Sequence, residues 1–140
     1  MIPIQNFRLQ RLPDQPGLAL NSELIWNDRL VGRVLAGAVM EAQFSLPDGG
    51  YLLLVTDDCP FEEGLHIYLL NAWYELLEQD ILGCPYTAAI VENVKVAGDN
   101  VVTFSFIGDH QVTVYDQPQI LGLLGRKGRL KVSGISPGPR

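Results

Sequence analysis

Alternation of apolar and polar residues is the dominant pattern along the chain, and it predicts β-strands. Successive side chains of a strand point to opposite faces of its sheet, so a strand with one buried face alternates apolar and polar residues. The clearest case is the segment from residue 38 to residue 46. We expect one buried face there, made of Ala38, Met40, Ala42, Phe44 and Leu46.

Turn-forming residues separate the alternating segments and predict hairpins. Pro47-Asp48-Gly49-Gly50 combines a fixed proline φ with two glycines that tolerate positive φ, so residues 51–55 should return antiparallel. Residues 101–107 and 111–115 should form a second hairpin. The side chains of this hairpin that we expect to face the core are Val102, Phe104, Phe106, Val112 and Val114.

Residues 72–82 fit two different elements. Trp73, Leu76, Leu77 and Ile81 have helical spacing, which would give a single helix. The segment also follows residues 65–70 and could pair with them across a turn at Asn71-Ala72. Because it lies within a series of hairpins, we favour a strand and keep the helix as the alternative.

These elements predict an all-β fold, an antiparallel meander of about nine or ten short strands. A closed barrel and a two-sheet sandwich both accommodate such a meander, and the order of the strands slightly favours the barrel. Residues 1–135 are expected to form a single β domain. Residues 136–140 lack apolar side chains and should be a frayed C-terminal tail.

Two of the predicted strands, residues 52–55 and 65–70, are apolar on both faces. Their second face would need a covering surface, which a helix or a second subunit could supply. We therefore predict a homodimer. The side chains in need of this cover are Leu53, Val55, His66, Tyr68 and Leu70.

Charge is distributed unevenly along the chain, whose formal net charge is −6. Between Val34 and Gly125 a single cation, Lys95, stands against thirteen acidic residues, whereas the flanks hold nine cations and three acids. If the two ends paired, their cations could form one patch for an anion or an acidic partner. Solvated strand faces are the preferred interpretation.

The cations near the C-terminus are the candidate basic patch: Arg126, Lys127, Arg129 and Lys131. Nucleic-acid binding through them is not expected, because no aromatic platform is interleaved. We expect them to solubilise an edge strand. The start of the chain has no signal-peptide pattern and no apolar run long enough to span a membrane, so we expect a soluble, cytoplasmic protein without a membrane partner.

The segment 56–66 holds the densest collection of reactive groups. Its candidate residues are Asp57, Asp58, Glu62, Glu63 and His66. Their spacing matches no calcium loop and no zinc motif, so neither a metal nor a cofactor is expected. Neighbouring carboxylates could raise one another's pKa and produce a general acid. The favoured interpretation is an acidic loop that faces water.

Cys59 and Cys84 form a possible pair. If Asn71-Ala72 is a two-residue turn, antiparallel register places the two cysteines opposite each other, within reach of a disulfide. Two reduced thiols are the favoured state for a cytoplasmic protein, and a redox clasp is the alternative.

No motif in the sequence specifies an activity. Our leading hypothesis is a non-enzymatic protein-interaction module that uses its acidic middle and its two-faced apolar strands. The alternative is a small-ligand-binding β-barrel whose cavity is lined by residues such as Phe44, Phe104 and Phe106. A third hypothesis is an enzyme that uses the acidic loop 57–66, which would require those side chains to converge on a concave site.

Overall fold

The computed structural model describes residues 1–13, 20–59, 61–121 and 125–135, and its regular elements are all strands. The twelve strands are paired antiparallel throughout. They are β1 (Ile2–Pro3), β2 (Phe7–Arg11), β3 (Asn21–Trp26), β4 (Arg29–Ala36), β5 (Val39–Ser45), β6 (Tyr51–Thr56), β7 (Gly64–Leu70), β8 (Leu76–Gly83), β9 (Glu92–Gly98), β10 (Val101–Ser105), β11 (Asp109–Leu121) and β12 (Arg126–Gly134).

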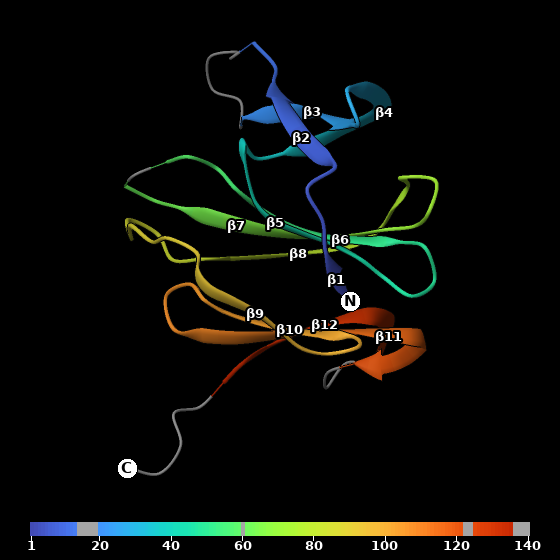
Figure 1. The fold of residues 1–140 in the computed structure, drawn as a ribbon. Helices are drawn as coiled ribbons and strands as arrows, with labels where there is room; N and C mark the ends of the chain where they lie inside the picture. The colour runs from blue at the N-terminus through green and yellow to red at the C-terminus, as the bar shows by residue number, and fades with distance from the viewer. Residues whose placement is uncertain (14–19, 60, 122–124, 136–140) are drawn as a thin grey trace.

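The strands form three sheets that stack as three layers (Figure 1). A five-stranded sheet, β1-β5-β6-β7-β8, lies between the three-stranded sheet β2-β3-β4 and the four-stranded sheet β12-β11-β10-β9. The predicted all-β antiparallel class is confirmed, with more strands than expected. Layered sheets fit a sandwich, and the described residues form no closed barrel. The helix alternative for residues 72–82 is wrong, because β8 occupies that segment.

The central sheet is buried on both faces by the chain itself. Leu52 and Leu54 pack toward the four-stranded sheet, and Leu53 and Val55 pack toward the three-stranded sheet, with no exposed surface on any of the four. The doubly apolar strands are therefore correctly identified, but their cover is neither a helix nor a second subunit. The homodimer stays a prediction, but the uncovered strand faces that motivated it are covered by the chain itself.

Both predicted hairpins are present. Leu46 N–H donates to Gly50 O at 2.8 Å, and Gly49 has a φ of +90°, so the glycines close the turn between β5 and β6 as expected. Val102 pairs with Val112 across β10 and β11. The five side chains assigned to the core of this hairpin are all buried in it.

One predicted face is wrong at Met40. A register shift in β5 between Met40 and Ala42 places one extra residue there. Because side chains alternate with a period of two, the extra residue turns Met40 to the opposite face. Met40 packs on the side of the three-stranded sheet, while Ala42 and Phe44 pack on the other side.

Aromatic side chains join the three-stranded layer to the central sheet at one end of the molecule. The ring of Phe7 lies 4.6 Å from Trp26, 4.9 Å from Tyr51 and 5.9 Å from Tyr74, with edge-to-face geometry in each pair. Edge-to-face pairs contribute about 0.5–1.5 kcal/mol each beyond their buried area. The cluster therefore fixes how the two layers sit on each other at this end.

The link between β4 and β5 depends on glycine at position 37, which gives a first prediction. Gly37 has a φ of +113°, and a Cβ there would lie 3.2 Å from Thr56 O and closer still to Val55 Cγ1. Gly37→Ala should therefore lower the free energy of unfolding by about 2 kcal/mol or more, measured by urea denaturation. The matched control is Gly98→Ala, since a Cβ at Gly98 would meet no atom within 4 Å. Equal losses in both variants would contradict the prediction.

Candidate functional site

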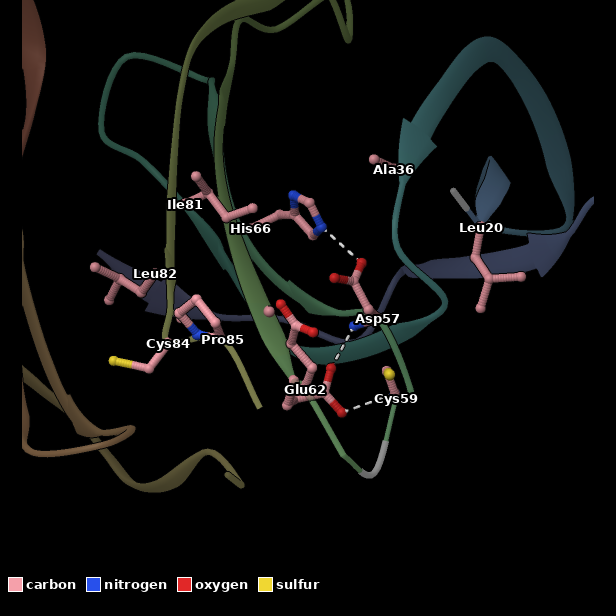
Figure 2. Close-up of a pocket in the computed structure, with 13 residues that line it drawn as sticks. Leu20, Ala36, Asp57, Cys59, Glu62, His66, Ile81, Leu82, Cys84 and Pro85 are labelled. Carbon is pink, nitrogen blue, oxygen red and sulfur yellow. Dashed lines mark hydrogen bonds and ion pairs between the residues drawn. The ribbon is translucent and has the colours of Figure 1, made fainter. Parts of the chain in front are cut away.

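An open pocket of about 670 Å³ lies between the central sheet and the three-stranded layer. We call it the interlayer pocket. Figure 2 shows Leu20 and Ala36 on one side of it, His66 and Ile81 on β7 and β8, and the loop from Asp57 below. Its lining residues are Leu20, Ala36, Asp57, Cys59, Glu62, Glu63, Gly64, His66, Ile81, Leu82, Gly83, Cys84 and Pro85.

Glu63 shapes the loop that closes one end of the pocket. Its Oε1 accepts hydrogen bonds from the backbone N–H of Asp57 at 2.7 Å and of Asp58 at 3.1 Å, and its Oε2 accepts one from Cys59 N–H at 3.1 Å. Backbone donors satisfied by a carboxylate form strong, charge-assisted bonds. Glu63 N–H also donates to Thr87 O at 3.1 Å, which ties the loop to the segment after β8. Glu63 therefore determines the shape of the loop at this end of the pocket.

His66 and Asp57 form the polar centre of the pocket. His66 Nε2 lies 2.7 Å from Asp57 Oδ1, and an ionised carboxylate only accepts, so Nε2 donates this bond. The imidazole also stacks on Tyr68, its neighbour on the same face of β7, with ring centroids 5.8 Å apart and an interplanar angle of 1°. Both contacts hold the ring in place, and the ring in turn orients Asp57. Asp57 Oδ2 accepts no hydrogen bond among the described residues.

The five acidic-loop candidates divide between the pocket and its surroundings. Glu62 turns its carboxylate toward Asp57 and His66 (Figure 2), and it has no side-chain partner among the described residues. Asp58 instead pairs with Arg11 of β2 at 2.7 Å and does not line the pocket. Thus four of the five residues meet in one concavity, which carries no lysine or arginine in its described lining.

This arrangement does not place a nucleophile next to a base. The imidazole nitrogen that faces the loop is engaged by Asp57, and Cys59 lies beyond Asp57 from the ring (Figure 2). Nucleophilic catalysis needs the thiol and the base within hydrogen-bond reach of each other. Within the described ranges, no three histidine, cysteine or acidic side chains are positioned to hold a metal ion.

The predicted opposition of Cys59 and Cys84 is wrong. Leu65 pairs with Leu82, whereas a two-residue turn would have paired it with Glu78, a difference of four positions. Three of these positions come from the turn, where Asn71 Oδ1 accepts hydrogen bonds from the N–H groups of Trp73 at 2.9 Å and Glu75 at 3.0 Å. The fourth comes from a register shift between Leu69 and Leu70.

Both cysteines nevertheless line the interlayer pocket. Figure 2 shows them at opposite sides of it, with the sulfur of Cys84 turned outward, and both are free thiols in the structure. The two thiols are therefore separate groups at the edge of one concavity.

The candidate basic residues lie on β12, in the four-stranded outer layer. The basic N-terminal part of the chain lies in the three-stranded layer on the other side of the central sheet (Figure 1). β12 pairs with β11, and β2 pairs with β3, so the two ends do not pair and the single combined patch does not form. Arg126, Lys127, Arg129 and Lys131 all belong to this strand.

The side chain of Arg129 makes contacts within the protein. It binds Asp48 at 2.6 Å and donates from Nε to Tyr115 O at 2.7 Å. Burial opposes the ionisation of Asp48, but hydrogen bonds from Gly50 and Arg129 outweigh it and lower the pKa of Asp48. Arg129 therefore fastens the four-stranded layer to the turn between β5 and β6.

One exposed apolar side chain lines the pocket, and two more lie next in sequence to lining residues. Ile81 is 60% exposed, Phe61 is 81% exposed and Tyr86 is 91% exposed. We call these three residues the apolar rim. Tyr86 has a φ of +57°, so its loop holds a non-glycine residue in the left-handed region. The sequence does not indicate that these segments are close, because Glu63 N–H bonds to Thr87 O only once the chain is folded.

No protein-family model, curated protein or solved structure matches this chain. The described residues include no helix that is long and apolar enough to cross a membrane.

The role of Glu63 gives a second prediction. In a Cys84→Ser background, Glu63→Ala should accelerate labelling of Cys59 by a thiol reagent about tenfold, because three backbone N–H groups lose their acceptor and the loop opens more often. Glu62→Ala is the matched control, since Glu62 makes none of these bonds. Equal labelling rates in the two variants would show that Glu63 does not hold the loop.

Tyr68 gives a third prediction, on alkaline stability. Burial, reinforced by the Asp57 carboxylate, raises the pKa of Tyr68 to about 12 from its ordinary 10.0. Between these values the unfolded chain loses a proton that the folded chain keeps, so the free energy of unfolding falls as pH rises. Tyr68→Phe should be about 1–2 kcal/mol less stable at pH 7, because Tyr68 Oη donates to Ala36 O at 2.8 Å.

The variant should also lose less stability than the parent between pH 10 and pH 12. Urea denaturation at both ends of this range measures the difference. The other tyrosines are common to both proteins and cancel in the comparison. If the free energy of unfolding fell equally in the parent and the variant, the raised pKa of Tyr68 would be refuted.

Proposed function

We propose that this chain is a non-enzymatic interaction module that binds a segment of a partner protein at the apolar rim of the interlayer pocket. The observation that carries the proposal is a preformed concavity whose lining residue Ile81 is 60% exposed, with the exposed rings of Phe61 and Tyr86 next in sequence to the lining residues Glu62 and Pro85. Large apolar side chains gathered on a surface mark interaction sites more often than isolated ones do.

The three rim residues are connected to the pocket through the segments that line it. Ile81 lines the pocket directly, while Phe61 and Tyr86 are adjacent in sequence to the lining residues Glu62 and Pro85. The bond from Glu63 N–H to Thr87 O connects the two loops that carry these aromatic rings. Aromatic residues are enriched at protein interfaces and supply large contact areas.

The proposal modifies the leading hypothesis from the sequence. The two-faced apolar strands are used inside the molecule, so they are not the docking surface. The acidic middle remains part of the proposed docking surface, because Asp57 and Glu63 line the pocket.

A second candidate is a small-ligand site in the same pocket. Its volume of about 670 Å³ lies within the range of about 300–1,000 Å³ typical of small-molecule sites. A barrel interior does not support this candidate, because Phe44, Phe104 and Phe106 pack within the core between two sheets. We favour a protein segment because the rim extends beyond the pocket.

Selection of peptides tests the proposed function. A phage-displayed library of random twelve-residue peptides is panned against the full chain, and the enriched peptides are measured by titration calorimetry. Ile81→Asp should weaken their binding at least tenfold, because it places a charge among apolar contacts. Ile120→Asp is the matched control, since Ile120 is 73% exposed on β11 in the opposite outer layer.

Two outcomes would overturn the proposal. One is a library without enriched peptides, in which case binding of small molecules in a fragment screen would favour the second candidate. The other is enriched peptides that bind the Ile81→Asp variant as tightly as the parent chain.

A further inference from the structure

We infer that the interlayer pocket receives a positively charged side chain, arginine or lysine, of the partner segment, with Asp57 as its main acceptor. This inference rests on the proposed function and adds the chemistry of the anchoring residue. In this inference the rim contacts apolar side chains of the partner segment, and the carboxylates of the pocket select a positively charged side chain.

The first argument is the orientation of Asp57. His66 Nε2 holds Oδ1 at 2.7 Å, and the backbone around Asp57 is fixed by Glu63. The carboxylate is therefore pre-positioned, with Oδ2 left as an acceptor. A pre-organised acceptor loses little conformational entropy when a donor binds, so its affinity for a donor is higher.

The second argument is charge complementarity. Glu62 points its carboxylate toward the same space as Asp57 (Figure 2), and the described lining contains no lysine or arginine. The other two acids of the loop have internal partners, since Asp58 pairs with Arg11 and Glu63 binds three backbone N–H groups. Asp57 Oδ2 accepts no hydrogen bond among the described residues, so this oxygen and the Glu62 carboxylate favour a cation between them and oppose an acidic occupant.

The third argument is the shape of the walls. Leu20, Ala36, Ile81 and Pro85 line the pocket with apolar surface on the way to the carboxylates. Arginine and lysine carry several methylene groups below the charged head, and these pack favourably against apolar walls. A long basic side chain thus matches the pocket over its whole depth, whereas a small free amine would leave the walls and the rim unused.

The test uses the peptides selected on the parent chain. We expect them to share an arginine or lysine, and replacement of that residue by citrulline or norleucine should weaken binding at least tenfold. Asp57→Asn should weaken the parent peptide by a similar factor and leave the neutral peptide unchanged, as expected for two groups that contact each other. Higher salt should weaken only the charged peptide.

Two further variants make the result interpretable. Glu62→Gln removes a carboxylate that has no side-chain partner in the described part of the chain, so a loss of binding there does not depend on the fold around His66. Glu92→Gln, an exposed acid on β9 in the opposite outer layer, is the charge-matched control and should bind as the parent does. Urea denaturation verifies that each variant is folded.

The outcomes separate this inference from the proposed function. Peptides that lack a common basic residue, or that bind Asp57→Asn and Glu62→Gln as tightly as the parent, would overturn the inference. If Ile81→Asp still abolishes their binding, the interaction module stands without its charged anchor. If Ile81→Asp also has no effect, the site itself is refuted.

Discussion

Burial of the central sheet on both faces is the constraint on which the rest of the structure depends. Strand β6 places four consecutive residues from Leu52 to Val55 alternately into two cores, with none of them exposed. Burying each such side chain contributes about 1.5–3 kcal/mol. Each outer sheet covers one of these apolar faces, and its detachment would expose that face to water. The chain must therefore fold as three layers. The interlayer pocket lies at the edge of one of the two resulting interfaces.

The layering brings the basic ends of the chain against its acidic middle. The basic ends supply β2 to β4 and β12 of the outer sheets, whereas the acidic middle supplies β5 to β8 of the central sheet and also β9 to β11 of the four-stranded sheet. Arg11 binds Asp58 on one side and Arg129 binds Asp48 on the other, so cations of each outer layer meet acids of the middle layer. Exposed ion pairs contribute little individually. Their main consequence is that Asp58 and Asp48 have arginine partners, whereas Asp57 contacts only His66 among the described side chains and Glu62 has no side-chain partner there.

Local patterns in the sequence predicted local structure well. The hairpins at residues 47–50 and 101–115 have strong turn chemistry and clear alternation, and both formed as expected. The errors arose where the register differs from the expected one, by four positions between β7 and β8 and by one in β5. The side chain of Asn71 lengthens a turn and moves Cys84 away from Cys59, and an extra residue at Glu41 turns Met40 to the other face. Only the one-residue shift in β5 changes a face, because side chains alternate with a period of two.

The candidate site shows why chemical composition predicts less than geometry. The loop from Asp57 to His66 was identified from its density of charged groups, yet its acids have different roles. Glu63 satisfies backbone donors and so determines the shape of the loop, which could be known only once the loop folds back on itself. Leu20 and Ala36 come from another layer and carry no chemical signal in the sequence. A binding site formed between layers is therefore a property of packing, and its apolar walls become recognisable only when the sheets are stacked.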